Sequence, residues 1–278
     1  MQNVYSLLRL EYAKFRKNAA IGLLAIMFMI LMPTIIFIGK EFDNIDLPDE
    51  LPLISSIYKF PMIWDYLGYV GNWLVFFFLG LISVFMVVNE ISYKTFRQNI
   101  IIGMTRKKYF LSKVYSNVAI SLLATIYYAI IALAIGLVHT EGLEIGDILD
   151  TGWAIPRFFL MSFGYMSFGL LCAFVFRRSG ISVLFYLCYI LMIEHLIKWA
   201  MHFRYFNNSS INYYPSNSIE DLMPLPWLWI ADFAVKIEFS KEINFNLLLN
   251  KTEATIASIV WIAIFLSLAY WVFNRKDI

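Results

Sequence analysis

Three side chains that could do chemistry stand close together inside an apolar stretch: Glu194, His195 and Lys198. Glu194 and Lys198 are four residues apart, so on a helix they share a face and can form an ion pair. Charged groups at such depth are costly and tend to face protein or water, which makes these three residues candidates for lining or gating a polar path. The alternative is structural: Lys198 reaches a polar surface at the end of the stretch, and the neighbouring Trp199 anchors the stretch at that surface.

A second group of polar residues lies in a cationic stretch, residues 89–113, between two apolar runs. Gly103 followed by Met104 and Thr105 indicates a turn, and the stretch is long enough for a short helix, that turn and the start of another helix. One interpretation is a surface helix presented to a partner. The other is that the basic residues only fix the orientation of the chain. The polar residues of interest are Glu90, Lys94, Thr95, Arg97, Gln98, Gly103, Thr105, Arg106 and Lys107.

Sequence motifs of common enzymes are absent. No Gly-x-x-x-x-Gly-Lys-Ser/Thr loop occurs, so we expect that this chain does not hydrolyse ATP itself. Neither His-Glu-x-x-His nor Gly-x-Ser-x-Gly occurs, which argues against a zinc protease and a serine hydrolase. His139, His195 and His202 show no metal-ligand spacing with a cysteine or carboxylate, and Cys172 and Cys188 lie in apolar runs. We therefore expect no enzyme activity, no metal site and no cofactor in this chain.

The elements that position these residues must be membrane helices. Of the 278 residues, 60% are hydrophobic and only 15% are charged, against roughly 25% charged in an ordinary soluble domain. Six apolar runs each approach the roughly 20 residues that a bilayer demands, and each must be helical to satisfy its own backbone in hydrocarbon. The runs cover about 19–38, 71–88, 114–138, 158–176, 181–201 and 255–273. The sequence predicts an all-α integral membrane protein with six transmembrane helices in one domain, 1–278.

Basic residues mark one side of this membrane protein. If the N-terminus lies inside, nearly all lysines and arginines beside the runs fall on the inner side, whereas 39–50 and 141–150 on the other side are mostly acidic. Lysine and arginine retained on the cytoplasmic side are the positive-inside pattern, so we expect both termini in the cytoplasm. The formal net charge of +2 is too small to suggest a nucleic-acid partner.

The first 17 residues are not apolar enough to span a membrane. On a helix, Val4, Leu8, Tyr12 and Phe15 would form one apolar stripe. This pattern predicts an amphipathic helix in the cytoplasmic interface, with the basic groups near lipid headgroups. The alternative is a frayed basic tail.

A long segment, residues 202–253, separates the last two runs. Part of it is apolar but is broken by Pro224 and Pro226, and it carries Trp227 and Trp229. Tryptophan favours the headgroup level, so the segment predicts an interfacial or re-entrant helix over 225–239.

The order of residues in the cationic stretch resembles that of ABC-2 type transporter permeases. Glu90 closes the second run, a Lys-Thr-x-Arg element follows at 94–97, and a Gly-x-Thr-Arg turn at 103–106 precedes the third run. The resemblance implies that residues 90–113 contain a coupling helix, which docks on an ATP-binding subunit through the polar residues of the stretch named above. It also implies that residues 1–17 form the connecting, or elbow, helix.

The same resemblance implies the partners of the chain. Two permease chains, identical or homologous, would pair in the lipid bilayer and dock on two copies of an ATP-binding subunit, which would bind ATP and magnesium. The substrate would leave through the dimer centre, lined mainly by the second and fifth helices. The expected location is a bacterial cytoplasmic membrane, and the expected function is ATP-driven export of an unidentified substrate.

Two other functions stay open on the sequence. A secondary transporter driven by an ion gradient would predict discontinuous helices and midplane carboxylates, and only Glu194 comes close to such a position. An ABC-coupled membrane scaffold that translocates no solute is not separated from an exporter by any residue pattern. The substrate, and the choice between homodimer and heterodimer, are not indicated.

Overall fold

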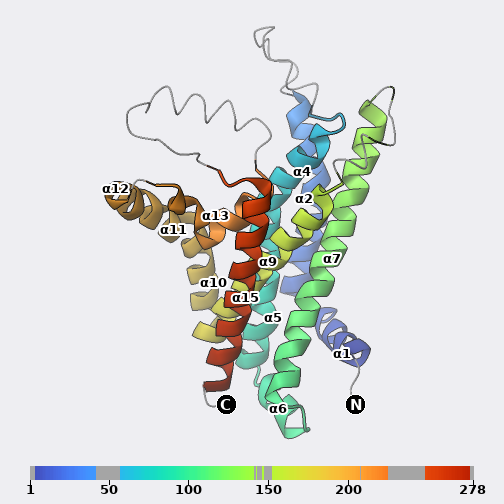
Figure 1. Cartoon of the computed structure of the whole chain (residues 1–278). Coiled ribbons are helices and arrows are strands. Elements are labelled where there is room, and N and C mark those ends of the chain that lie inside the picture. The colour runs from blue at the N-terminus through green and yellow to red at the C-terminus, as the bar shows by residue number, and fades with distance from the viewer. Residues whose placement is uncertain are drawn as a thin grey trace.

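The computed structural model describes residues 4–41, 57–140, 142, 146, 152–206, 208–224 and 248–275, with the backbone alone for 35–41. Every regular element in this part of the chain is a helix, which confirms the predicted all-α class (Figure 1). The re-entrant helix expected over 225–239 lies outside the described residues.

Five helical stretches are long and apolar enough to cross a membrane, and they correspond to five of the six predicted runs. They are Met62–Ser92, Arg106–His139, Ala154–Phe176, Ser179–Tyr205 and Lys251–Arg275. The remaining run forms α2 (Ala19–Glu41), which meets α1 (Val4–Phe15) at an angle of 94°. The chain is therefore a multi-pass membrane protein with five candidate spans, or six if the bent α1–α2 pair counts as one.

The second span begins earlier than hydropathy predicts, at Met62 instead of residue 71. Its first helix, α4 (Met62–Leu74), includes Asp65, which forms ion pairs with Arg157 and Lys251. A carboxylate lowers the hydropathy of a run, whereas the folded chain neutralises that carboxylate with cations from distant segments. The helix therefore begins before the predicted run, and the ion pairs that hold Asp65 within it cannot be seen in the local sequence.

A π-helical segment, η2 (Val75–Leu79), joins α4 to α5 (Gly80–Ser92) within the second span. The Tyr186 hydroxyl donates a hydrogen bond to the backbone oxygen of Phe76 at 2.8 Å, inside this segment. Any Cβ atom at residue 80 would overlap the Tyr186 hydroxyl, so this close approach requires Gly80. A side chain inserted into the backbone ladder is a recognised cause of such helix irregularities.

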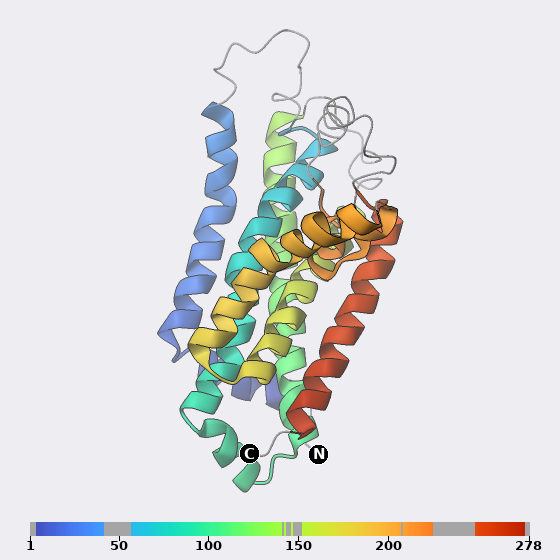
Figure 2. The ribbon, with the colours of Figure 1, turned by 90° about the vertical axis from the view of Figure 1, so that its left-hand side faces the viewer.

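The fifth span is also irregular. It comprises α10 (Ser179–Cys188), η3 (Tyr189–Ile193), α11 (Glu194–Leu196), η4 (Ile197–His202) and α12 (Phe203–Tyr205), where η3 and η4 are π-helical. Its second half leans away from the bundle, to the left in Figure 1, and the span runs diagonally across the front of the bundle in Figure 2. The chain then returns through η5 (Ser209–Tyr213) and α13 (Pro215–Glu220) to the beginning of α15 (Lys251–Arg275).

The central helix of the bundle is α9 (Ala154–Phe176), which packs against α5, α7 (Arg106–His139), α10 and α15. Phe158 of α9 stacks on Tyr128 of α7 with ring centroids 4.2 Å apart. The helices α1 and α6 (Thr95–Ile101) and the end of α15 lie at one end of the bundle (Figure 1), which we call the α6 end. The beginnings of α4, α9 and α15, together with α13, lie towards the opposite side, here the α13 end.

Candidate functional site

The cationic stretch predicted from the sequence folds as α6, with a turn on each side. Lys94 precedes α6 with φ 58° and ψ 11°, a left-handed conformation that stops α5 from continuing. Gly103 follows α6 at φ 103°, a value that glycine adopts without strain. The Thr105 side chain then accepts the backbone N–H of Lys108 at 3.3 Å and caps α7. The stretch is thus a helix between two tight turns.

Two buried residues hold α6 against the bundle. The Phe96 ring packs 4.6 Å from Tyr109 of α7 and 5.5 Å from Phe273 of α15, measured between centroids. Met104 is also buried. Arg106 donates to the backbone oxygen of Asn274 at 3.0 Å, which ties the start of α7 to the end of α15. These contacts fix α6 to two spans rather than leaving it on a free loop.

The outer face of α6 points away from the protein. Arg97 and Gln98 are exposed, and so are Ile101 at the end of α6, at 84%, and Ile102 directly after it, at 85%. Lys107, at the beginning of α7, is also exposed. The sequence analysis did not single out these isoleucines. The signal was present, because two adjacent β-branched apolar residues in a cationic loop have no span to belong to.

Glu90, by contrast, faces inward and belongs to a buried ion network with Glu11, Lys14 and Lys113. The Lys113 Nζ atom lies 2.5 Å from Glu11 Oε2 and 2.6 Å from Glu90 Oε1. The Lys14 Nζ atom lies 3.0 Å from Glu11 Oε1 and 2.8 Å from Glu90 Oε1. Ser112 donates to Glu11 at 3.3 Å. The network therefore joins α1, α5 and α7 at the α6 end, and Thr95 adds a hydrogen bond to the Glu90 backbone oxygen at 3.2 Å.

The sequence pattern did not point to Glu11 and Lys14, because the partners Glu90 and Lys113 lie on other helices. The buried residues of α1 are Leu7 and Glu11, whereas Val4 and Tyr12 of the predicted stripe are exposed. An acid among many basic residues, three positions before a lysine, was the available signal.

At the α13 end, Glu194 caps a helix and does not form an ion pair with Lys198. Its carboxylate accepts the backbone N–H groups of Ser216 at 2.9 Å and Asn217 at 2.8 Å, at the first turn of α13. Lys198 donates to the Asn217 side-chain oxygen. His195 Nδ1 lies 3.2 Å from the backbone oxygen of Ile190. The three residues singled out in the sequence thus lie around α13, two of them bonded directly to it.

Two acidic residues that the sequence analysis did not name complete this polar region. Asp221 accepts the Asn217 side-chain amide and the Leu249 backbone N–H, each at 3.0 Å. Burial raises the pKa of Asp221 to about 7, against the Leu249 hydrogen bond, which lowers it. Burial likewise raises the pKa of Glu220, although Lys198 and His195 act in the opposite direction.

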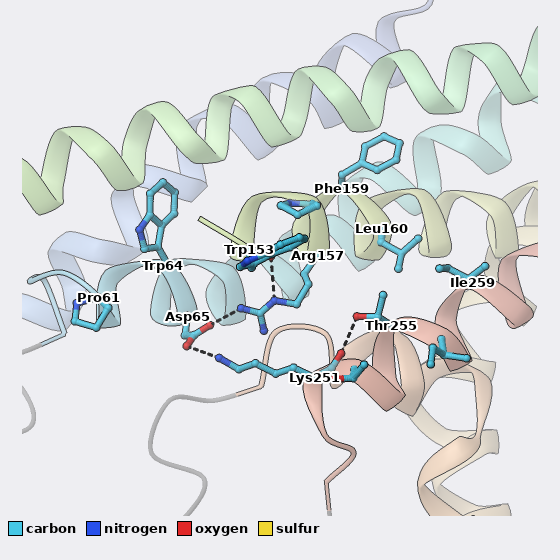
Figure 3. Close-up of a pocket in the computed structure, with 13 residues that line it drawn as sticks. Pro61, Trp64, Asp65, Trp153, Arg157, Phe159, Leu160, Lys251, Thr255 and Ile259 are labelled. Carbon is cyan, nitrogen blue, oxygen red and sulfur yellow. Dashed lines mark hydrogen bonds and ion pairs between the residues drawn. The ribbon is translucent and has the colours of Figure 1, made fainter. Parts of the chain in front are cut away.

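A cavity of about 780 Å³ opens between the beginnings of α4, α9 and α15 (Figure 3). Asp65 bridges two cations at its edge, Arg157 at 3.3 Å and Lys251 at 3.1 Å. Arg157 also donates to the backbone oxygens of Trp153 at 3.1 Å and Leu222 at 3.2 Å. These bonds join α4, α9 and α15 at the α13 end.

In the part of the chain that the structure describes, no group of three histidine, cysteine, aspartate or glutamate residues could hold a metal ion. The arrangement therefore offers two features for function: an exposed helix braced by a buried ion network at the α6 end, and a polar region with cavities at the α13 end.

Comparison with known proteins adds one finding. A family model described as "ABC-2 family transporter protein" matches residues 75–278, from the π-helical segment of the second span onward. The match includes α6, Glu90, Lys113 and the polar region around α13. A search of curated proteins finds no match to this chain.

Proposed function

The chain belongs to the ABC-2 family of transporter proteins, and on this basis we propose that it exports a substrate with ATP hydrolysed by a separate subunit. Membership makes it a permease that works with an ATP-binding subunit. Two permease chains, identical or homologous, would pair in a bacterial cytoplasmic membrane. ATP and magnesium would bind to the partner, and this chain would not act as an enzyme.

One observation supports the coupling role above all: α6 projects an exposed cationic and apolar face from a rigid base. Arg97 and Gln98 offer polar contacts, and Ile101 and Ile102 offer an apolar tip that water does not favour. Phe96 fixes the other face of α6 to α7 and α15. A closing motion of the ATP-binding subunits would therefore move these helices instead of bending a loop. We assign the coupling helix to α6.

We further propose that α1 is the elbow helix and that the α6 end faces the cytoplasm. The 94° turn between α1 and α2 lets α1 lie across the bundle, and exposed Val4 and Tyr12 would contact lipid. The Asn18 side chain supports this turn by accepting the backbone N–H groups of Ala20 at 3.1 Å and Ile21 at 3.3 Å. The ion network then links α1 to the helices on both sides of α6.

The test is recovery of the partner. The tagged chain, purified from native membranes, is expected to bring a soluble P-loop subunit and ATPase activity with it. Arg97→Glu reverses an exposed charge on α6 and is expected to abolish this recovery at normal expression. Arg204→Glu makes the same charge change on α12, at the opposite end of the bundle, and serves as the matched control.

Three outcomes are informative. Loss of the ATP-binding subunit with Arg97→Glu, but not with Arg204→Glu, supports coupling through α6. Equal recovery of this subunit with both variants contradicts the assignment, because α6 would then make no important contact with it. If the unchanged chain purifies without an ATPase, export powered by a partner is refuted, and a transporter driven by an ion gradient becomes the leading function.

A further inference from the structure

A small cavity lies between the two irregular spans of the bundle. It has a volume of about 160 Å³ and is lined by residues that include Asn72, Trp73, Phe76, Tyr165, His195 and Glu220. A second cavity of about 240 Å³ shares His195 and Glu220 with it. We call the first one the Glu220 cavity.

The backbone around the Glu220 cavity is irregular on both sides. Phe76 belongs to the π-helical segment η2, and the lining residue Ile190 belongs to the π-helical segment η3. Single π-helical turns are frequent at functional sites. The cavity is also accessible, because Trp73 is 50% exposed at its rim. A ligand could therefore enter between the second and fifth spans.

Two residues that line this cavity, Asn72 and Glu220, carry side-chain hydrogen-bond acceptors. The side-chain oxygen of Asn72 is buried in a residue that is 3% exposed, and it has no hydrogen-bond partner among the described residues. The carboxylate of Glu220 forms no hydrogen bond or ion pair in that same part of the chain.

One acidic residue lines the cavity. It is Glu220, and the nearby Lys198 ammonium group is bound to Asn217. Aromatic rings complete the lining, with Phe76 and Tyr165 centroids 6.0 Å apart. Aromatic faces attract cations within about 6 Å, and a charged donor strengthens each hydrogen bond to these acceptors. A buried unpaired acceptor is costly, so a donor that fills the cavity is favoured.

We propose that the Glu220 cavity binds an organic primary ammonium group, and that amines of this class are substrates of the transporter. The assignment as substrate rests on the proposed export function. The binding site itself does not, because it depends only on acceptors, rings and charge within this chain.

The test measures binding to the purified full chain in nanodiscs of phosphatidylcholine, without the ATP-binding subunit. Phenethylammonium is the probe and 2-phenylethanol is its neutral counterpart; titration calorimetry gives the two affinities. Phenethylammonium is expected to bind. The affinity of 2-phenylethanol should be at least about tenfold lower, because it cannot form a charge-assisted hydrogen bond.

Two variants locate the site. Glu220→Gln removes the charge at nearly constant shape and is expected to lower ammonium affinity about tenfold. Asn72→Leu removes the acceptor and is expected to lower it several-fold. Glu253→Gln makes the Glu220 charge change on the exposed first turn of α15 and is expected to bind like the unchanged chain. Thermal unfolding of each variant separates lost binding from lost folding.

The proposal is overturned if Glu220→Gln and the unchanged chain bind phenethylammonium equally, or if the alcohol binds as well as the ammonium. Failure of the export function looks different: binding persists, but no ATPase is recovered with the chain. Where the complex is recovered, the probe is expected to stimulate its ATPase activity, and Glu220→Gln is expected to reduce that stimulation. Binding without stimulation would refute the assignment as substrate while retaining the site.

Discussion

At the residue scale, Lys113 places its ammonium group on a side chain with no solvent exposure. This buried charge depends on the carboxylates of Glu11 and Glu90, whose oxygens lie 2.5 Å and 2.6 Å from the Lys113 Nζ atom. Taking one member out of a buried ion network leaves uncompensated charge in a medium that solvates it poorly. The geometry therefore makes the lysine and its two carboxylates interdependent.

We predict that Lys113→Met destabilises the folded chain by about 3–5 kcal/mol, because two buried carboxylates lose their shared partner. Lys14→Met is the matched comparison, since Lys14 contacts the same carboxylates but its side chain is 28% exposed. Water can replace part of the Lys14 interaction, so Lys14→Met should lower the free energy of unfolding by less than Lys113→Met does. Denaturant unfolding in detergent gives both values, and equal losses would contradict the prediction.

The raised pKa of Asp221 predicts that the stability of the folded chain depends on pH. Burial raises its pKa from 3.8 to about 7 in the folded chain, with a further contribution from the Glu220 carboxylate and opposition from the Leu249 hydrogen bond and Lys198. The folded chain therefore holds this proton more tightly than the unfolded chain does. It follows that the contribution of Asp221 to stability is greatest below pH 3.8 and is lost as pH rises to about 7.

The change that tests this is Asp221→Asn, which removes the titrating group and can still accept the Leu249 N–H. The melting temperature of the unchanged chain should decline as pH rises from 3.8 to about 7, and this decline should become shallower in the variant. Glu253→Gln should keep the original slope. An unchanged slope in Asp221→Asn would show that burial does not raise this pKa.

The sequence alone indicated part of this chemistry. Glu90 and Lys113 bound the cationic stretch, but their mutual contact depends on how α5 and α7 pack, and Glu11 lies 102 positions before Lys113. Glu194 was identified as an ionisable residue at membrane depth. Its role as a cap for α13 could not be predicted, because the segment after residue 206 gives no clear helical signal.

At the element scale, Gly80 allows the Tyr186 hydroxyl to reach the Phe76 carbonyl within the second span. We predict that Gly80→Ala destabilises the chain by roughly 1–3 kcal/mol, the usual cost of overpacking. Gly22→Ala is the control, because no atom lies within 4 Å of the place that its new methyl group would take in α2. Alanine there should be neutral or slightly stabilising.

Thermal unfolding of the two variants in the same detergent provides the comparison. Tyr186→Phe adds a second reading, since it removes the hydroxyl without adding volume. If Gly80→Ala melts like Gly22→Ala, the close approach of the fifth span to the second is not required for stability.

Helix existence and type were predictable from apolar run length, whereas the buried polar residues of the helices were not. The buried side of α1 carries Glu11. A hydropathy scale assigns Glu11 to a polar, exposed face, but its ion pair with Lys113 of α7 allows it to be buried. The same reasoning explains why Asp65 lies inside the second span instead of in the preceding loop.

At the scale of the whole molecule, the two ends of the bundle are built differently. At the α6 end, the ion network and Phe96 join helices to one another, and cavities of about 590 Å³ and 210 Å³ lie beside them. At the α13 end, cavities lie next to irregular helices and carboxylates. Basic and acidic segments in the sequence predicted two different sides, but neither the ion network on one side nor the irregular helices on the other.

The buried Lys113 also has a consequence for how the chain is made. A nascent chain enters the membrane from its N-terminus, so Glu11 and Glu90 are already in place when the third span emerges from the ribosome. Both carboxylates can therefore accept the lysine as soon as α7 packs against α1 and α5, and the ion pairs would form during synthesis instead of after it.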